Sequence, residues 1–312
     1  MINFGLPYMG SKSKIAADLI RILPPGRRFV DVFAGGCAMT HAALIAGKWE
    51  RYLMNDVIDI PRLFLDAACG RYRDERRWIS REDFARLRDT DLYVRVSWSF
   101  GNKGDSYIYS REIEPYKRAC HYAVVFDDWA PLYELCPETA PAAQRALRGK
   151  TDIKQRRLAF GPAIVRRLKA LRDPALLDRN PLYRSVRRGK HPDGTYLQSL
   201  ESLQSLEITA TAKDYRTIKI PENAVVYADP PYANTNEYAT EFFCTEFHDW
   251  LRSVDIPVFV SEYEMPEDFE PIWSRKKVCT LGAGNRTQTI ERLYVRRDFV
   301  DRYRPDLFTY GI

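Results

Sequence analysis

Short apolar runs alternate with helical patterns near the start of the chain, and this alternation constrains the fold more than any other feature. The run Arg28–Phe33 is closed by Ala34-Gly35-Gly36, which is typical of a buried strand that enters a tight turn. A helix at Ala38–Ala46, a strand at Tyr52–Asp56 and a helix at Val57–Cys69 are expected to follow. This order predicts a parallel sheet with helices on its faces.

The same pattern returns in the last third of the chain. The expected elements there are a strand at Ala224–Ala228, a helix at Glu241–Ser253, a strand at Ile256–Ser261 and a closing antiparallel pair at Lys277–Leu281 and Glu291–Arg297. The two stretches together predict an α/β fold with a doubly wound, mostly parallel sheet of the Rossmann-like kind.

The interval between the two stretches breaks the alternation. It is rich in Arg, Tyr and Trp, and a chain of 312 residues has room for about two domains. We therefore expect residues 1–70 and 207–312 to form one domain, into which residues 71–206 are inserted as a second, mainly helical domain.

One segment carries all of the basic excess that gives the chain its net charge of +6. Residues 145–190 hold 15 Lys and Arg against three acids, a net +12, which leaves −6 for the rest of the chain. A surface that binds a polyanion would explain this run, and a solvated helical face is the alternative.

Several further features narrow the class of protein. No apolar run approaches the ~18 residues that a membrane span needs, and we expect no secretory signal. The six cysteines form no C-x-x-C pair and the four histidines do not cluster with them. We therefore expect no metal site, no disulfide framework, and a cytoplasmic protein with reduced thiols.

Asp229-Pro230-Pro231-Tyr232 directly follows the expected strand Ala224–Ala228. Two prolines cannot continue the hydrogen-bond ladder, so they fix a turn at the carboxyl end of a strand, where open α/β sheets bind ligands. The motif suits a planar base with an amino group, because Asp229 and a proline-turn carbonyl can accept from the amine while Tyr232 stacks on the ring. The alternative is a proline-rich turn with a surface tyrosine.

The first expected turn has the small residues that a cofactor loop needs. Gly35 and Gly36 let a ligand approach the backbone, and the N-terminus of the following helix favours a carboxylate. Asp56 ends the second expected strand, where a doubly wound sheet places a ribose-binding acid. The alternative role for Asp56 is the N-cap of the helix that starts at Val57.

These motifs resemble those of DNA adenine-specific (N-6) methyltransferases of the Dam family. The similar segments are Asp229-Pro230-Pro231-Tyr232 (the family's catalytic signature), Phe33-Ala34-Gly35-Gly36 after Asp31 (its loop for S-adenosylmethionine, SAM), Tyr8-Met9-Gly10-Ser11-Lys12 (its N-terminal motif) and Ser99-Phe100-Gly101-Asn102 (some phage-type members). The order of loop, insertion and catalytic motif is that of the family's alpha arrangement, in which the insertion is the target-recognition domain.

The resemblance implies SAM as the cofactor. Asp214-Tyr215 is similar to the acid–aromatic pair that holds the adenine of SAM, with an ordinary loop acid as the alternative. Lys12 is expected at the methionine end of SAM or on a DNA phosphate, with a solvated lysine as the alternative. The implied catalytic residues are Asp229, Pro230, Pro231 and Tyr232, and the implied cofactor-binding residues are Tyr8, Gly10, Lys12, Asp31, Phe33, Ala34, Gly35, Gly36, Asp56, Asp214, Tyr215 and Asp229.

One position departs from the family's pattern. The family loop usually reads Phe-x-Gly-x-Gly, and Cys37 stands at the last glycine. A cysteine with a positive φ would be strained. We therefore expect the loop to turn at Gly35 and Gly36, and Cys37 to begin the helix at a negative φ.

Aromatic and polar residues interleave in the first part of the insertion. The aromatics are Trp98, Phe100, Tyr107 and Tyr109, and the polar residues among them are Asn102, Lys103 and Arg111. Those aromatics that are not core suit base stacking, and the polar side chains suit base-edge contacts. The residues expected to contact DNA are Asn102 and Lys103 at base edges, and Arg156, Arg157, Arg187 and Arg188 at phosphates.

The resemblance implies methyl transfer from SAM to the exocyclic amine of adenine in a specific double-stranded DNA sequence, after the base flips out of the duplex. The alternative activities are amino-methylation of cytosine N-4, of adenine in RNA or of a protein amide. Cytosine enzymes usually carry Ser, and amide enzymes Asn, where Asp229 stands. A DNA-binding module with a vestigial methylase fold is the alternative of another class. We expect a monomer at the DNA of a bacterium or phage-infected cell, with a cognate restriction endonuclease as the one protein partner to consider.

Overall fold

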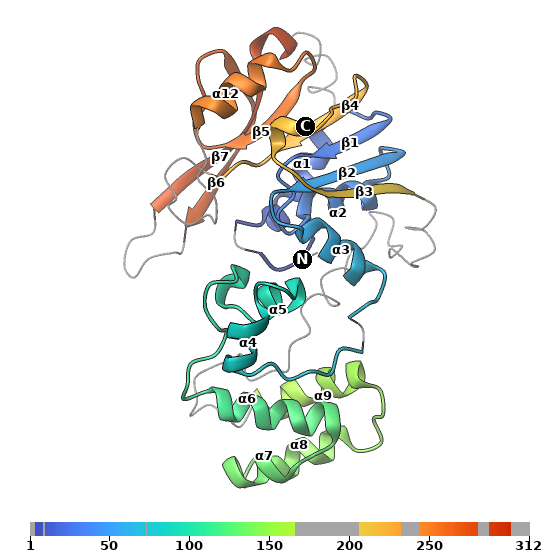
Figure 1. The fold of residues 1–312 in the computed structure, drawn as a ribbon, viewed down its shortest axis with the longest axis vertical. Helices are drawn as coiled ribbons and strands as arrows, with labels where there is room; N and C mark the ends of the chain where they lie inside the picture. Colours follow the sequence, from blue (N-terminus) through green and yellow to red (C-terminus); the bar gives the residue numbers. More distant parts are fainter. Residues whose placement is uncertain are drawn as a thin grey trace. The chain divides into compact units, whose positions relative to one another are not determined.

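The structure is a computed structural model that describes residues 4–8, 10–72, 74–165, 206–231, 244–279 and 287–300. These residues fall into two compact units (Figure 1). The first unit contains the described residues up to Cys69 and those from 206 onward, and the second contains the described residues of 70–165.

The first unit is built on a seven-stranded sheet in the order β3-β2-β1-β4-β5-β7-β6 (Figure 1). Its strands are β1 (Arg28–Asp31), β2 (Arg51–Asp56), β3 (Glu207–Ala212), β4 (Ala224–Ala228), β5 (Val258–Glu262), β6 (Phe269–Cys279) and β7 (Thr287–Arg296). All neighbours from β3 to β5 are parallel, whereas β7 pairs antiparallel with both β5 and β6. The expected doubly wound, mostly parallel sheet is therefore confirmed.

The chain reverses its progress across the sheet between β1 and β4. Strands β1, β2 and β3 follow one another toward one edge, and β4 then returns to pair with the other side of β1. Ligands of open α/β sheets bind outside the carboxyl ends of the strands at such a reversal. Asp31 ends β1 and Asp229 follows β4, so the fold brings these two acids to the reversal point.

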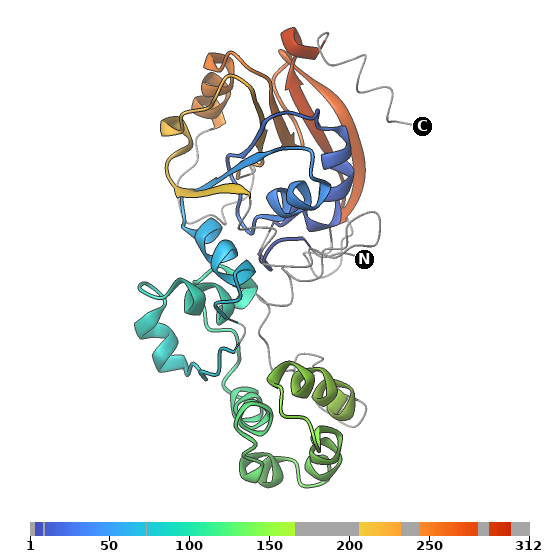
Figure 2. The ribbon, with the colours of Figure 1, turned by 90° about the vertical axis from the view of Figure 1, so that its right-hand side faces the viewer.

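Helices cover both faces of this sheet (Figures 1 and 2). They are α1 (Ala16–Ile22), α2 (Ala38–Ala46), α3 (Ile60–Ala68) and α12 (Cys244–Ser253). Val30 and Val226 pack in one apolar cluster with Phe247 of α12. Successive strand residues point to opposite faces, and Asp31, the neighbour of Val30, accepts hydrogen bonds from Thr40 of α2. Helices α12 and α2 therefore lie on opposite faces.

The helix after β2 begins later than the sequence indicates. Its first residue is Ile60 rather than Val57, and Asp59 is its N-cap. The delay has a local cause, because Asp56 Oδ1 accepts a hydrogen bond from Ile58 N at 3.1 Å and closes a turn ahead of the helix. By contrast, α2 and β4 have the bounds that the sequence predicts.

The closing antiparallel pair is confirmed, but its first strand is longer than expected. Strand β6 starts at Phe269 rather than Lys277 and pairs with β7 along its whole length. Its register shifts between Pro271 and Trp273. A proline at an irregularity in an edge strand disrupts the period-two pattern by which a strand is recognised.

The described part of the second unit is mainly helical, as expected. Its elements are α4 (Arg81–Leu87), α5 (Leu92–Ser97), the 3-10 helix η2 (Phe100–Asn102), α6 (Glu114–His121), a π-helical extension (Tyr122–Phe126), α7 (Ala130–Leu135), α8 (Ala140–Leu147) and α9 (Ile153–Val165). Helices α6 to α9, green in Figure 2, share a buried apolar cluster that includes Val124, Leu132 and Leu147. Within the described residues, no helix has the length and apolar character that a membrane crossing requires.

Residues 4–8 of the first unit cross over the glycine turn that follows β1. Leu6 N donates to Gly36 O at 2.6 Å, and Gly5 N donates to Nδ1 of the buried His41 at 2.9 Å. A Cβ atom on Gly36 would lie 2.7 Å from Leu6 O and 2.9 Å from Cβ of Tyr8. Glycine at this position therefore permits the crossing, which leads the chain into the short helix η1 (Lys12–Lys14).

Gly36→Ala is expected to loosen this crossing, because the added methyl group meets the Leu6 carbonyl oxygen and would force the two segments apart by overpacking. Hydrogen exchange of the Leu6 amide should accelerate. Gly47→Ala is the control: unlike Gly36, Gly47 has a left-handed backbone at φ 62°, but nothing lies within 4 Å of its added Cβ. Faster Leu6 exchange in both variants, or in neither, would contradict this account.

Candidate functional site

Three acids lie at the carboxyl ends of neighbouring strands of the first unit. Asp31 ends β1, Asp56 ends β2 and Asp229 immediately follows β4. Strands β2, β1 and β4 are adjacent and parallel, so their carboxyl ends meet at one edge of the sheet. The carboxylates are close enough that Asp229 and Asp56 both influence the titration of Asp31.

Lys12 inserts its ammonium group between two of the site's carboxylates. Lys12 Nζ lies 2.5 Å from Asp229 Oδ1 and 3.3 Å from Glu291 Oε1. The side chains of Lys12 and Glu291 are each 2% exposed, whereas that of Asp229 is 18% exposed. Burial by itself would lower the pKa of Lys12, but attraction to Asp229 and Glu291 outweighs it, so the pKa is raised. The solvated role considered for Lys12 is therefore wrong.

Glu262 is a fourth acid near this lysine. It ends β5, and its Oε1 accepts a hydrogen bond from Tyr263 N at 2.8 Å. Burial raises the pKa of Glu262 to about 7, the hydrogen bond from Tyr263 opposes this, and the charge of Asp229 adds to the rise. Sequence analysis missed both Glu262 and Glu291 as site residues, because an acid within a strand pattern is indistinguishable from one on a solvated face.

Asp31 is buried with one carboxylate oxygen unsatisfied. Its Oδ2 accepts from Thr40 N at 3.2 Å and from Thr40 Oγ1 at 2.7 Å, while Oδ1 has no hydrogen-bond partner among the described residues. Burial raises the pKa of Asp31 to about 7 against the effect of Thr40, and Asp229 and Asp56 raise it further. An unsatisfied buried carboxylate oxygen is costly to the fold and is a feature of functional sites.

Asp56 organises the glycine turn rather than capping a helix. Its Oδ2 accepts from Gly35 N at 2.8 Å, and its other oxygen accepts from Ile58 N. Burial raises the pKa of Asp56, and these backbone hydrogen bonds oppose the rise. The N-cap alternative is wrong, since α3 begins at Ile60 with Asp59 as its N-cap.

The turn contains a left-handed cysteine, contrary to expectation. Gly35 has a φ of 46° and Cys37 a φ of 59°, so Cys37 does not begin the helix at negative φ. Cys37 N donates to Ala34 O at 2.6 Å, and this hydrogen bond closes the turn around the conformation. Burial and then the charges of Asp31 and Asp56 raise the pKa of the Cys37 thiol well above its ordinary value. The thiol is therefore held protonated, as a packing residue.

A buried asparagine next to Asp56 fixes the strand ends to one another. Asn55 Nδ2 donates to Val32 O at 3.1 Å and to Lys213 O at 2.9 Å, and its Oδ1 accepts from Lys213 N at 3.0 Å. These hydrogen bonds join the segments after β1 and β3 to β2. Sequence analysis missed Asn55, although its position before a strand-ending acid was the available signal.

An aromatic cluster lies beside the glycine turn. The ring centroid of Phe33 lies 5.2 Å from that of Tyr215 and 5.5 Å from that of Phe247, and Tyr215 also contacts Trp250 at 5.3 Å. Asp214, in contrast, accepts from Arg216 Nη2 at 2.6 Å. This pairing lowers the pKa of Asp214. Tyr215 thus lies against the expected cofactor turn, while the Asp214 carboxylate is engaged by its own loop.

The remaining residues expected at the cofactor lie near the turn or outside the described residues. The ring of Tyr8 packs over Gly35, where an added Cβ would lie 3.4 Å from its Cδ1. Gly10 is exposed, with a φ of 78°. Pro230 is buried and Pro231 half-buried. Tyr232 lies outside the described residues, as do Arg187 and Arg188.

The second unit divides its aromatic residues between core and surface. Trp98 and Tyr107 are buried, and Tyr109 stacks on Trp78 with 6.0 Å between ring centroids. Phe100, in contrast, is 70% exposed. Asn102 lies beside it at a φ of 62°, and Asn102 Nδ2 donates to Val96 O at 2.8 Å. The loop therefore presents Phe100 and uses the Asn102 side chain to hold its own turn.

Several arginines of this unit are tied into the fold. Arg156 is 9% exposed and donates to Val124 O at 2.6 Å, to Ala123 O at 2.7 Å and to Asp127 Oδ1 at 2.5 Å. Arg156 thus holds the end of the π-helical turn in place. These contacts give its side chain a structural role that requires no DNA phosphate. Its neighbour Arg157 is half-buried and donates to Glu75 O at 3.2 Å.

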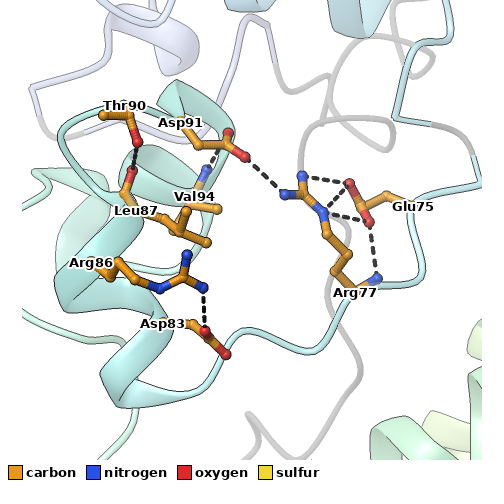
Figure 3. A network of polar contacts seen from close by, with 8 residues as sticks. All are labelled: Glu75, Arg77, Asp83, Arg86, Leu87, Thr90, Asp91 and Val94. Carbon is orange, nitrogen blue, oxygen red and sulfur yellow. Dashed lines mark hydrogen bonds and ion pairs between the residues drawn. The ribbon is translucent and has the colours of Figure 1, made fainter.

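Figure 3 shows a second group of such contacts, around the start of α5. Arg77 Nη2 lies 2.8 Å from Glu75 Oε2, and Arg77 Nη1 lies 2.8 Å from Asp91 Oδ2. Asp91 also caps α5 by accepting from Val94 N. Because both carboxylates bind the Arg77 guanidinium, this arginine stabilises the fold of the unit, and its positive charge is already compensated.

Residues 8–124 match the family model described as D12 class N6 adenine-specific DNA methyltransferase. This part of the chain is thus similar to the D12 class of methyltransferases. The match confirms the resemblance to adenine methyltransferases and continues through α6 of the second unit, beyond the loop that carries Phe100. No curated protein matches the chain.

The D12 match contains Lys12, Asp31 and Asp56 but ends before Asp229 and Glu291. Geometry connects the two parts, because the ammonium of Lys12 bonds to both later carboxylates. Within the described residues, no three His, Cys, Asp or Glu side chains are placed to hold a metal ion. The carboxylates of Asp229 and Glu291 both contact the ammonium of Lys12.

Asp31→Asn is expected to stabilise the protein most above pH 7, by less at pH 5, and hardly at all toward pH 4. The folded pKa of about 7 lies above the ordinary 3.8, so wild-type stability falls as pH rises through this window. Asparagine removes that loss, which is on the order of 1–4 kcal/mol. Urea unfolding at pH 5 and pH 8.5 measures it, with the exposed Asp59→Asn as control. A gain that is equal at both pH values would contradict the assigned burial.

Proposed function

We propose that this chain is a methyltransferase of the D12 class and transfers the methyl group of SAM to the exocyclic amine of adenine in a specific double-stranded DNA sequence. The single observation that carries the proposal is Asp229: an acid after β4, at the reversal point of the sheet, with its carboxylate partly accessible. The first unit would hold the cofactor and the target base, and the insertion, residues 71–206, would recognise the DNA.

The charge of the site supports a cationic cofactor. Asp31 interacts with Asp56 and Asp229, and Glu262 with Asp229 and Glu291, while the ammonium of Lys12 lies between Asp229 and Glu291. Such an excess of acids is costly in a buried site unless positive charge enters it. SAM brings a sulfonium and an ammonium group, and it supplies the electrophilic methyl when bound. The small Gly35–Gly36 turn, the unsatisfied Asp31 oxygen and the aromatic ring of Phe33 would hold it.

The chemistry asks little of the protein beyond positioning. The lone pair of an adenine amine is delocalised into the ring, so the free amine is a poor nucleophile. Hydrogen bonds from the amine to Asp229 and to a carbonyl of the Pro230-Pro231 turn would favour a pyramidal nitrogen and localise its lone pair. Preorganised acceptors of this kind act without a strong base. The target base must leave the duplex to reach them.

The alternative substrates are less compatible with these residues. A cytosine or amide enzyme usually carries Ser or Asn where Asp229 stands, and the D12 description names adenine in DNA. The alternative of a vestigial, purely DNA-binding fold would not need a buried carboxylate with an unsatisfied oxygen at Asp31. Both observations favour an active DNA adenine methyltransferase.

The second unit presents an exposed aromatic side chain, Phe100, and exposed arginines that could contact DNA. Phe100 is 70% exposed on a loop that Gly104 and Asn102 hold in shape. Arg145 and Arg148 are exposed at the end of α8, within the basic run. We infer that Phe100 stacks on a base and that these arginines contact phosphates. Arg156 is left out of this set because its guanidinium is already bonded within the fold.

Asp229→Ala and Asp56→Ala should separate turnover from cofactor binding. Loss of the amine acceptor at Asp229 is expected to reduce methyl transfer by about 10²–10³, with SAM affinity within a few-fold of wild type. Loss of Asp56 should instead weaken SAM binding by ~1.5–3 kcal/mol. Calorimetry and a tritium-transfer assay measure the two effects. Near-normal turnover of Asp229→Ala would sink the assignment.

Phe100→Ala is expected to weaken binding to duplex DNA by ~1–3 kcal/mol, the usual contribution of one stacked base. Phe126→Ala is the matched control, since Phe126 is also an exposed phenylalanine of the second unit, at 48%. Fluorescence anisotropy with labelled duplex at constant salt measures both variants. An equal effect of the two substitutions would remove Phe100 from the DNA interface.

A further inference from the structure

Lys12 makes the contact to Asp229 that the proposed reaction assigns to the target amine. Asp229 Oδ1 accepts from Lys12 Nζ at 2.5 Å, and a protonated amine and an exocyclic adenine amine are both N–H donors. The pair joins residues 217 positions apart in the sequence, from η1 and from the end of β4. Because the ammonium occupies Asp229 Oδ1, a base amine that approaches this same oxygen competes with the lysine.

We propose that Lys12 is a placeholder for the target amine on Asp229, and that Glu291 is the positioning residue that receives the lysine when the base binds. This inference rests on the proposed function, in which Asp229 accepts from the adenine amine. The exchange moves one hydrogen bond and breaks no covalent bond: Asp229 loses an N–H donor of Lys12 and gains one of the base.

The geometry around Glu291 suits this exchange. Glu291 Oε1 already lies 3.3 Å from Lys12 Nζ, so the ammonium needs only a short movement away from Asp229 to complete that contact. Both side chains are 2% exposed, and an ammonium that left Asp229 without another carboxylate would be a buried, unpaired charge. Glu291 on β7 thus provides a second carboxylate for the buried ammonium when it leaves Asp229.

The neighbouring charges reinforce the exchange. Glu262, which ends β5, acts on Lys12, on Asp229 and on Glu291 through its charge. When Lys12 moves toward Glu291 it remains among carboxylates, while the partly accessible Asp229 carboxylate becomes available to the neutral base. When no base is bound, Lys12 therefore keeps the Asp229 carboxylate paired. When the base binds, its amine replaces Lys12 on Asp229.

A double-mutant cycle on the full chain tests the proposal. Glu291→Gln removes the receiving charge, so Lys12 should stay on Asp229 and slow methyl transfer by about ten- to hundredfold, the range expected for a hydrogen bond to a charged group. SAM affinity, measured by calorimetry, should change little. The double variant Lys12→Met/Glu291→Gln removes both the competing ammonium and the receiving carboxylate, so the net charge of the site is unchanged. It should transfer methyl groups at least tenfold faster than Glu291→Gln alone. Glu291→Asp keeps the charge and should keep most of the turnover.

The readout is tritium transfer from SAM to unmethylated plasmid DNA at saturating SAM, with thermal unfolding of each variant as a check on folding. A double variant as slow as Glu291→Gln, or slower, would overturn the placeholder role and leave Glu291 as a structural residue. If Glu291→Gln does not fold, Glu291→Asp is compared with the double variant instead. Loss of turnover in both of these variants would also overturn the placeholder role of Lys12. Asp229→Ala is run alongside: if it retains turnover, the proposed function fails instead.

Discussion

The buried ammonium of Lys12 is the interaction on which the site depends. It joins the N-terminal segment to the end of β4 and to the interior of β7, which are far apart in the chain. Asp229, Glu262 and Glu291 would repel one another without it, since buried like charges disfavour ionisation. The lysine thus permits a set of acids to gather at the strand ends, where a cationic cofactor and a neutral base are proposed to bind.

The sheet determines where the acids of the site lie, and the segments that connect the strands bring Lys12 to them. Reversal of the chain between β1 and β4 brings Asp31 and Asp229 to one edge. The glycine turn after β1 then allows residues 4–8 to cross it, and this crossing carries Lys12 toward Asp229. A change in either the turn or the crossing segment would therefore be felt at the site.

Sequence analysis predicted the parts of this arrangement that depend on local patterns. The apolar runs Arg28–Phe33 and Ala224–Ala228 identified β1 and β4, and β1 ends at Asp31, two residues before the expected end. Sequence analysis failed where tertiary contacts decide: Glu291 lies inside a strand, and nothing local distinguishes its paired, buried carboxylate from an exposed one. Cys37 is left-handed because the hydrogen bond from Cys37 N to Ala34 O fixes the turn around it, against the residue's own preference.

The most direct test of the account is the identity of the methylated product. The full chain is incubated with tritiated SAM and, separately, with unmethylated duplex DNA, RNA and a protein mixture, and labelled DNA is digested to nucleosides for mass spectrometry. The account predicts label in duplex DNA alone, recovered as N6-methyladenine at a recurrent sequence. Label in N4-methylcytosine, in RNA or in protein, or no transfer to DNA by the folded chain, would contradict it.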